Sequence, residues 1–598
     1  MLTTLTAPAF AGTWYIEDGD ITISAGKTEG TNKVTQGTTT DEEDTNTTIT
    51  NRDKDTPSSN TVTIKAENEN DKVEVKLEDV NIDASRGSEA AVSVTGKGDT
   101  TIELDGDNEL KSGAGHAGLE HNKTDTSGEL TIQDKDKNGS LEAAGGFKGA
   151  GIGSAGSNDA QVKITGGNIT ATSDDWGAGI GSGSYGTGTV EITGGEINAT
   201  GGYLGAGIGG GCNGSGNVTI SGGTITAAGG DGAAGIGGGY YNGATVTITG
   251  DAVIKNASTT VYGAGIGGGN GYDGDVTISG NAKIENATGG YGAAGIGGGA
   301  FSSPDKIGNG NVVIKDNAKI DNVQGGAYGA GIGGGIYGLS NVTIEGNTKV
   351  NATGGAGGAA IGGGAGAENN SDNNGNQITI KSNENGSPTI NAVGGGTDEG
   401  EEIVIGGAGI GAGCESDADA DITLEGKVTI TATAGKDNVA IGANGIEQEF
   451  SGLAEGSSIT RYDSEGNDTS LPGDKVPVTP VVPDDTSSGG SADASVQESV
   501  FPGLVVTDKD GQRISYTSIR GNNVLSLRVG RFTASLHASL ATLRQLRAEG
   551  IDTITFQTIL CSTTLSVDEL LAMGGEDTEV VLTHHIRSST LTVGGKAV

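Results

Sequence analysis

The stretch Val218–Gly239 reads VTISGGTITAAGGDGAAGIGGG, and variants of it recur through most of the chain. Its two alternating segments, Val218–Ile220 and Thr224–Thr226, place every second side chain on the same side, which is typical of short β-strands. The glycine-rich phrase that follows has a central isoleucine, here Ile236. That isoleucine recurs at positions 152, 180, 208, 236, 266, 296, 332, 361, 410 and 441, at first every 28 to 30 residues. Strands repeated at such a period predict a solenoid.

Stacking of these units explains both the strands and the glycines. A single unit cannot bury its inward valines and isoleucines, whereas stacked units bury them by pairing each strand with its counterpart one coil away, at ~4.8 Å. The 598 residues include 114 glycines and only 4% aromatic residues. Glycine suits the coil corners because it accepts positive φ and lets backbones approach closely. We therefore predict an all-β fold, a single-stranded parallel β-helix.

The repeat does not cover the whole chain, and composition divides the rest. The first residues end in Ala9-Phe10-Ala11, the small-residue pattern of a signal-peptidase site, which predicts export. Trp14–Ser24 is read as a capping strand, and the acidic stretch Thr38–Ser58 is expected to be a loop. The predicted domains are a residual signal peptide (1–11), an N-terminal cap and acidic loop (12–59), the parallel β-helix (60–470), a linker rich in proline, serine and glycine (471–496) and a small α/β or α+β module (497–598).

The C-terminal module has a different pattern. Phe532–Gly550 places leucines on one helical face and ends at a glycine, which predicts a helix. A strand over Ile551–Thr558, a short helix over Val567–Met573 and a strand over Glu579–Thr583 are expected to follow. His584 and His585 are adjacent and point to opposite faces of a strand, so we expect exposed or packing histidines rather than a metal site. This module is the candidate for contact with a protein partner.

Charge and hydropathy exclude several classes of protein. The chain has 35 basic and 76 acidic residues, a formal net charge of −41, and no arginine between Gly87 and Thr460. Nucleic-acid binding needs clustered basic side chains, so no nucleic-acid partner is expected. Residues 501–598 hold nine basic and nine acidic side chains, so the net charge belongs to residues 1–500. No apolar run predicts a transmembrane span, and three widely spaced cysteines predict buried thiols rather than disulfides or a zinc site.

Aromatic side chains recur at fixed places in successive units. One set precedes the central isoleucine by four or five residues, and a second set follows it by four to six. Stacking turns each set into a column, and amphipathic rings at coil intervals suit the sugars of a glycan. The rings also suit stacking on one another to shield glycine-rich corners, and both interpretations stay open. The candidate carbohydrate-binding residues are Trp176, Tyr203, Tyr262, Tyr291 and Tyr328 in the first set and Tyr185, Tyr240, Tyr272, Phe301 and Tyr337 in the second.

Two groups of oxygen ligands are candidates for Ca²⁺, the one cofactor that the sequence suggests. The first alternates up to Gly139 like the opening half of a calcium-binding loop, although Gly145 stands where a bidentate glutamate is expected. The second would share one face of a strand. A β-turn and a solvated acidic surface are the respective alternatives. The candidate metal ligands are Asp134, Asp136 and Asn138 in the first group and Asp417, Asp419 and Asp421 in the second.

A column of small polar residues stands ten positions before the central isoleucine. Such side chains in register either form a ladder along a solenoid corner or reflect the preference of asparagine for turns. The column comprises Thr170, Asn198, Thr226, Asn256, Asn286, Asn322 and Asn351.

Several phrases connect the chain to a known family. Gly12–Ser24 (GTWYIEDGDITIS), Thr100–Leu110 (TTIELDGDNEL) and the repeated VTISGGxITAxGGxxGAGIGGG resemble secreted β-helix proteins of anaerobic gut Firmicutes, which are usually named carbohydrate-binding-domain-containing proteins. The resemblance covers roughly residues 12–445 and excludes the C-terminal module. It implies a right-handed parallel β-helix, a secreted or bacterial cell-surface location, and binding of polysaccharide or of a host or cell-wall glycan.

Three classes of function follow from the sequence. The first is a secreted or surface-displayed adhesin that binds polysaccharide without catalysis along the aromatic columns. The second is a structural stalk or protein-binding scaffold that binds no glycan. The third is a calcium-dependent polysaccharide lyase or glycosidase, since other parallel β-helices catalyse such reactions. A glycosidase needs paired carboxylates ~5–9.5 Å apart, and the missing arginine removes the usual lyase base, so we expect no catalytic residues.

Overall fold

A computed structural model describes residues 11–301, 306–368, 375–397 and 405–477, and residues 503–597 apart from 510, 515, 522, 530, 532, 559, 560, 576, 577, 586 and 587. The chain separates into two compact units, residues 1–481 and residues 482–598. The predicted signal peptide, apart from residue 11, and residues 478–496 of the predicted linker lie outside the described residues.

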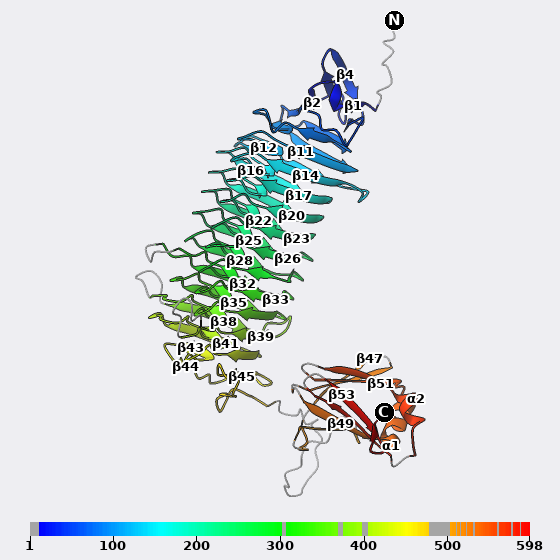
Figure 1. The fold of residues 1–598 in the computed structure, drawn as a ribbon, viewed down its shortest axis with the longest axis vertical. Coiled ribbons are helices and arrows are strands. Elements are labelled where there is room, and N and C mark those ends of the chain that lie inside the picture. Colours follow the sequence, from blue (N-terminus) through cyan, green and yellow to red (C-terminus); the bar gives the residue numbers. More distant parts are fainter. Residues whose placement is uncertain are drawn as a thin grey trace, which may run out of the picture. The chain divides into compact units, whose positions relative to one another are not determined.

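The first unit is a parallel β-solenoid, which confirms the predicted fold (Figure 1). Each repeat supplies two longer strands and one short Ile-Gly strand, and each strand pairs in parallel with its equivalent in the next coil.

The described strands form three stacks. The first stack contains β1 (Thr13–Tyr15), β5 (Thr48–Thr50), β7 (Lys72–Glu78), β10 (Asp99–Asp105), β13 (Leu130–Gln133), β16 (Asp159–Ile164), β19 (Gly188–Ile192), β22 (Gly216–Ile220), β25 (Ala244–Ile248), β28 (Gly274–Ile278), β32 (Gly310–Ile314), β35 (Ser340–Glu345), β38 (Asn376–Lys381) and β41 (Ala420–Glu425). The second contains β8 (Asn81–Asp83), β11 (Asp107–Lys111), β14 (Ser140–Gly145), β17 (Asn168–Ser173), β20 (Glu196–Thr200), β23 (Thr224–Ala228), β26 (Val253–Ser258), β29 (Lys283–Ile284), β30 (Ala287–Thr288), β33 (Lys319–Gln324), β36 (Lys349–Thr353), β39 (Thr389–Val393), β42 (Thr429–Thr433) and β45 (Ser458–Tyr462). The third contains β2 (Ile21–Ala25), β6 (Val62–Ala66), β9 (Val92–Gly96), β12 (Leu119–Lys123), β15 (Ile152–Gly153), β18 (Ile180–Gly181), β21 (Ile208–Gly209), β24 (Ile236–Gly237), β27 (Ile266–Gly267), β31 (Ile296–Gly297), β34 (Ile332–Gly333), β37 (Ile361–Gly362), β40 (Ile410–Gly411) and β43 (Ile441–Ala443).

The core is a set of aliphatic ladders in register. Val218 pairs with Val190 and Val246 in the first stack, and the central isoleucines pair with one another in the third. These side chains are buried, whereas their neighbours along each longer strand point outward. The strict alternation of period two therefore sets the register, because a slip by one residue would expose every ladder.

The glycine after each central isoleucine lets successive coils approach closely. Gly237 has φ of 140°, and its equivalents in the other coils have φ between 132° and 149°. A Cβ on Gly237 would lie 2.0 Å from the carbonyl oxygen of Gly267 in the next coil. A larger residue would both strain the backbone and push the coils apart, so glycine is required at this position.

The predicted column of small polar residues lies on the second stack and faces outward. The Asn322 side chain donates to Asn286 Oδ1 at 3.1 Å, so part of the column is a ladder. Asn286 and Asn351 instead donate to backbone carbonyls of the preceding coil. Apart from Asn286, which lies between β29 and β30, the column thus lies on strands, and only some of its side chains bond one another.

An antiparallel hairpin covers the N-terminal end of the solenoid. β3 (Asn32–Gln36) pairs with both β2 and β4 (Thr39–Asp44), and a short 3-10 helix (Ile16–Asp18) follows β1. Asp44 is buried and accepts hydrogen bonds from the Gly12 N–H and the Trp14 indole at 2.8 and 2.9 Å. The acidic stretch predicted as a loop therefore contains strands β4 and β5, because the hairpin is needed to cover an open sheet edge.

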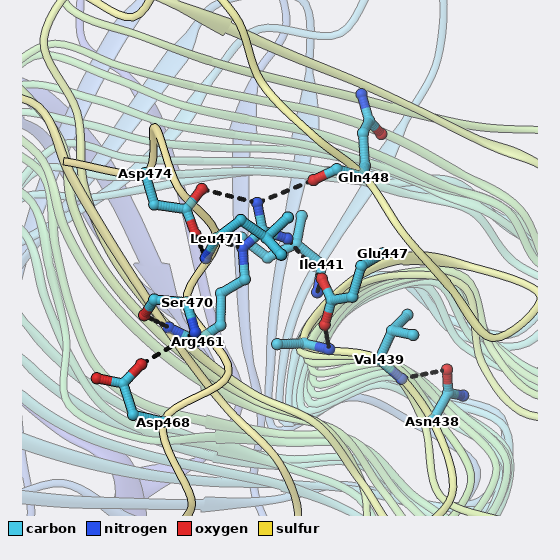
Figure 2. A network of polar contacts seen from close by, with 11 residues as sticks. Asn438, Val439, Ile441, Glu447, Gln448, Arg461, Asp468, Ser470, Leu471 and Asp474 are labelled. Atoms are coloured by element: carbon cyan, nitrogen blue, oxygen red, sulfur yellow. Dashed lines mark hydrogen bonds and ion pairs between the residues drawn. The ribbon is translucent and has the colours of Figure 1, made fainter. Parts of the chain in front are cut away.

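A buried ion cluster closes the C-terminal end, as Figure 2 shows. Arg461 lies between Asp474, which it contacts through Nε at 2.8 Å, and Glu447, at 2.5 Å. The Glu447 carboxylate accepts the backbone N–H groups of Ala440 and Ile441 at 2.7 and 3.2 Å. In inner coils these groups bond carbonyls of the next coil, so Glu447, on β44 (Ile446–Glu447), takes the place of a missing coil. Residues 471–477, assigned to the linker from sequence, belong to this cap.

The second unit is an α+β module with its own hydrophobic core. Its described strands form two sheets: β46 (Val505–Thr507), β49 (Ala534–Ser539), β52 (Glu579–His584), β53 (Ser589–Val593) and β54 (Lys596–Ala597) in one, and β47 (Thr517–Gly521), β48 (Val524–Arg528), β50 (Thr553–Gln557) and β51 (Ser562–Ser566) in the other. Its helices are α1 (Leu540–Ala548) and α2 (Val567–Leu571). The prediction of one helix over Phe532–Gly550 is wrong in its first half, which is β49. The Ser539 side chain caps α1 by accepting the Thr542 N–H, so the helix begins only there.

Candidate functional site

The two predicted aromatic columns meet on one surface of the solenoid. A backbone hydrogen bond joins the two columns in successive coils. Its donor is the N–H of the residue four positions after a central isoleucine, and its acceptor is the carbonyl oxygen of the residue four positions before the central isoleucine of the preceding coil. Cys212 donates to the Trp176 carbonyl at 2.7 Å, and Ala300 donates to the Tyr262 carbonyl at 2.7 Å. These bonds place both columns side by side. The resulting aromatic strip comprises Phe147, Trp176, Tyr185, Tyr203, Tyr240, Tyr241, Tyr262, Tyr272, Tyr291, Phe301, Tyr328 and Tyr337.

The rings of the aromatic strip lie on the outside of the solenoid. All twelve residues lie in the described part of the chain, and none of them is buried. Tyr185, Tyr203 and Tyr291 are 57%, 58% and 40% exposed. The strip is therefore not part of the aliphatic core.

Neighbouring rings also touch one another. Tyr291 makes edge-on contacts with Tyr262 and Tyr328, with centroids 6.2 and 5.6 Å apart. At the N-terminal end of the strip, Phe147 and Trp176 lie 5.2 Å apart. The two interpretations left open by the sequence thus describe the same residues, which contact one another and still present part of their surface to solvent.

Two lysines lie over the strip. Lys148 Nζ is 4.9 Å from the centroid of Trp176. Lys306 Nζ is 4.8 and 4.9 Å from the centroids of Tyr241 and Tyr272, and it donates to the Tyr272 hydroxyl at 3.1 Å. Both ammonium groups are attracted by the electron-rich ring faces, which holds them against the strip.

Several tyrosines of the strip have a backbone conformation that normally favours glycine. The φ angles of Tyr185, Tyr262 and Tyr337 are 66°, 58° and 63°, and Tyr241 and Tyr328 are similar. At the position of Tyr262 the two neighbouring coils carry Gly232 and Gly292, also with positive φ. A non-glycine residue in this region costs about 1–2 kcal/mol. Folding alone therefore favours glycine over tyrosine at these corners.

An open groove of about 490 Å³ lies beside Tyr272, between the strip and the first stack. Its lining includes the polar residues Ser215, Asn217, Asn242, Thr245, Asp273 and Asp275. Asp273 Oδ1 accepts the Asn309 N–H at 2.7 Å, and Asp275 Oδ1 accepts the Asn311 side-chain amide at 2.7 Å. Although much of the Asp273 side chain is exposed, partial loss of water around its carboxyl group raises its pKa. The groove therefore offers amides, hydroxyls and carboxylates next to a ring.

Two of the first calcium candidates, Asp134 and Asp136, lie close to Glu103, a residue that the sequence did not indicate. Oxygen atoms of Asp134, Asp136 and Glu103 lie within 4.8 Å of one another. The pKa of Asp136 is raised, mainly because its carboxyl group loses contact with water and also because of the neighbouring negative charges. Asp134 also accepts the backbone N–H groups of Asn138 and Gly139, at 3.2 and 3.1 Å, as in a turn. The backbone N–H of Asn138 thus takes part in the turn, and Lys135 Nζ lies 3.5 Å from Glu103.

The second calcium candidates lie apart from this group. Asp417, Asp419 and Asp421 are exposed and alternate with buried or half-buried residues, and only Asp421 lies in a strand, β41. Among the described residues, only the group around Asp134 brings ligand atoms of three aspartate, glutamate, histidine or cysteine side chains within 4.8 Å of one another.

Sequence reasoning missed several residues of the strip and groove. Phe147 extends the first column by one coil and could have been found by continuing the spacing upward. Tyr241 follows Tyr240 directly, and its place five residues after Ile236 was a usable signal. Lys306 and Asp273 lie in the segments of variable length between repeats, and no periodic signal marks them.

The cysteines and helices match the sequence predictions in part. Cys212 and Cys414 are buried free thiols, and burial raises the pKa of Cys414 to about 11. Cys561 is only half-buried. Within the described part of the chain, neither helix has the length and hydrophobicity of a membrane span.

Comparison with known proteins agrees with the solenoid. The sequence model of the Beta helix repeat family matches residues 162–184, 190–212, 218–240 and 276–300. No curated protein and no solved structure matches the chain.

Proposed function

We propose that the protein is a non-catalytic glycan-binding solenoid displayed outside the cell, and that the aromatic strip is its binding surface. The observation that carries the proposal is the pairing, at Tyr185, of a ring that is 57% exposed with a strained backbone of φ 66°. Strain of this kind is retained where a side chain is needed for function.

The chemistry around the strip supports a sugar ligand. Exposed tyrosine and tryptophan rings offer apolar faces to the C–H groups of a sugar, and their polar ends remain hydrated. Asn217, Asn242 and Thr245 in the groove supply amide and hydroxyl groups that match sugar hydroxyls. Burial and the adjacent Tyr241 hydroxyl raise the pKa of Tyr240 to about 12, so its phenol stays neutral at physiological pH.

The carboxylates of the groove favour binding over catalysis. Asp273 and Asp275 each accept a hydrogen bond from the next coil, which gives both a structural role. The calcium-dependent lyase, proposed as an alternative from sequence, has no arginine base between Gly87 and Thr460. A predicted export signal and the resemblance of the repeats support display outside the cell.

The repeats supply substitutions that preserve the fold. Asn213 occupies the corner equivalent to Tyr185 in the next coil, with φ of 56°. We expect Tyr185→Asn in the full chain to weaken glycan binding at least fivefold while the melting temperature stays equal or rises, because asparagine tolerates this conformation better than tyrosine. Binding is measured on a glycan array and then by the fluorescence of Trp176, the only tryptophan besides Trp14.

Ile446→Asn is the matched control, since Ile446 is 71% exposed but lies in the C-terminal cap. It should leave binding unchanged. If Tyr185→Asn lowers the melting temperature but leaves glycan binding unchanged, the ring serves packing. If the wild-type chain binds no glycan, the structural stalk is favoured instead.

A further inference from the structure

The aromatic strip extends over seven successive coils and then stops. Every coil from the one centred on Ile152 to the one centred on Ile332 supplies at least one ring. In the next coil, centred on Ile361, glycines 357 and 366 occupy the two corner positions, and the coil before Ile152 has Gly115 at the first corner. The strip therefore has a definite length, about 29 Å for six steps of ~4.8 Å.

We infer that the ligand is a neutral, extended, unbranched glycan that lies parallel to the solenoid axis with about one sugar per coil. This inference rests on the proposed function and adds the class and direction of the ligand. An extended chain advances by roughly one coil spacing with each sugar, so successive rings meet successive sugars. A glycan that crossed the solenoid would meet the rings of only one or two coils.

Ring contacts support the axial direction. Tyr262, Tyr291 and Tyr328 come from three consecutive coils, and their centroids are 6.2 and 5.6 Å apart. Phe147 and Trp176 continue the same line at the other end, 5.2 Å apart. In both segments the rings thus touch along the axis, from one coil to the next, which is the direction of an extended chain laid along the solenoid.

Charge selects a neutral glycan. Residues 1–500, which contain the solenoid, carry the net charge of −41, and Asp273 and Asp275 line the groove beside Tyr272. The cations that lie over the strip, Lys148 and Lys306, already face aromatic rings. A polyuronate or sulfated chain laid along the strip would be repelled by these carboxylates. The repulsion is only partly screened at physiological salt, because neighbouring coils are closer together than the Debye length of ~8 Å.

The length dependence of binding tests the inference. Neutral β-1,4-linked oligosaccharides of two to ten sugars are titrated into the full chain at physiological salt, beside oligogalacturonates of the same lengths. We expect the Kd to fall at least tenfold from the disaccharide to about the heptasaccharide and to change less than twofold beyond it, because added sugars bind at high effective concentration until the strip ends. The oligogalacturonates should bind at least tenfold more weakly at every length.

A pair of variants locates the chain on the strip. Tyr262→Gly introduces the residue that Gly232 and Gly292 supply at the same corner of the neighbouring coils. It removes the contact with Tyr291 in the fifth of the seven coils, where Tyr272 remains, and should reduce the gain beyond the tetrasaccharide. Tyr337→Gly introduces the residue that Gly366 supplies at the same corner of the next coil. It removes one of the two rings of the last coil, where Tyr328 remains, and should affect only the longest oligosaccharides. Melting curves confirm that both variants fold.

Each outcome decides between the two levels of the proposal. Neutral glycans that bind with no dependence on length, or oligogalacturonates that bind as tightly, would overturn this inference and leave glycan binding intact. Absence of binding by every neutral, acidic and amino-sugar oligosaccharide tested would overturn the proposed function and this inference with it.

Discussion

At the scale of the residue, one glycine per coil determines how closely the solenoid packs. Gly237 and its equivalents place bare backbone where a Cβ would collide with a carbonyl oxygen of the next coil, at 2.0 Å for Gly237. The positive φ at this position is a second, independent reason for glycine. A single added methyl group would therefore act on the spacing of two coils, not only on its own residue.

We expect Gly237→Ala to lower the free energy of unfolding of the solenoid by at least about 2 kcal/mol, since the substitution combines backbone strain with overpacking. Gly396→Ala is the control, because a Cβ there meets no atom within 4 Å and the φ of Gly396 is not positive. Both are measured by denaturant unfolding followed by tryptophan fluorescence. Equal effects of the two substitutions would contradict the assigned role of Gly237.

The positions of single residues were predictable where spacing carried the information. The ten aromatic residues were found by counting from the central isoleucine. Their convergence was not predictable, because it depends on how the backbone folds back between the two corners. Ala206 N–H bonds the Gly210 carbonyl at 2.9 Å, which closes the turn and brings both corners together. Glu103 was missed because it comes from the preceding coil, at no fixed repeat spacing from Asp134.

At the scale of the element, the caps decide whether the solenoid ends cleanly. Arg461 is fully buried and neutralises Asp474 and Glu447. We expect Arg461→Met to destabilise the C-terminal cap by about 3–5 kcal/mol, because the buried Asp474 and the partly exposed Glu447 lose their partner. Hydrogen exchange should accelerate at Ala440 and Ile441, and light scattering should detect self-association through the exposed strand edge.

Arg52→Met is the matched control for the cap. Arg52 pairs with Asp18 on the surface, where both side chains are about half exposed, and such an exposed pair contributes little to stability. Unchanged exchange at Ile441 in Arg461→Met, or the same acceleration in Arg52→Met, would argue against the ion cluster as the closing element.

A buried histidine makes one coil sensitive to acid. His121 on β12 is 2% exposed, its Nδ1 donates to the Gln161 carbonyl at 3.0 Å, and burial lowers its pKa. Below its ordinary pKa of about 6.5 the unfolded chain takes up a proton that the folded chain does not. The contribution of His121 to the free energy of unfolding is therefore fully present above pH 6.5 and declines as the pH falls below this value.

We expect the free energy of unfolding of the solenoid to fall between pH 6.5 and 5.5 on account of His121. His121→Asn keeps a donor toward Gln161 and should flatten this dependence. His585→Asn, at an exposed histidine of the other unit, should not. Denaturant unfolding of the three proteins by tryptophan fluorescence at pH 5.5, 6.5 and 7.5 makes the comparison, and parallel pH curves for all three would refute it.

Element types were predictable where one period dominates, and not where two patterns overlap. The repeats alternate strictly, and their strands were predicted correctly. In the second unit the leucines at 536, 540, 543 and 546 have helical spacing, yet Ala534–Ser539 also alternates buried and half-buried residues, and it forms β49. The strand wins because it pairs with β52 over six residues, a long-range contact that local spacing does not contain.

At the scale of the whole molecule, charge distinguishes the two units. Residues 501–598 have balanced charge, so the net charge of −41 belongs to the part of the chain that contains the solenoid. Coils ~4.8 Å apart bring carboxylates of several coils within the Debye length, which is about 30 Å at 0.01 M salt and about 3 Å at 1 M. Repulsion among them opposes folding of the solenoid at low salt, whereas the second unit carries no such excess.

We therefore expect sodium chloride, raised from about 0.01 M to about 0.5 M, to increase the melting temperature of the solenoid by several degrees and to leave that of the second unit nearly constant, since added ions screen the repulsion. Trp14 and Trp176 both belong to the solenoid, so their fluorescence follows that unit alone, and calorimetry of the same sample follows the second. The second unit thus serves as the internal control for general effects of salt. A fall in the solenoid's melting temperature would mean that surface ion pairs such as Lys76–Asp105 outweigh the net charge, and equal shifts in both units would mean that salt acts on them through something other than charge.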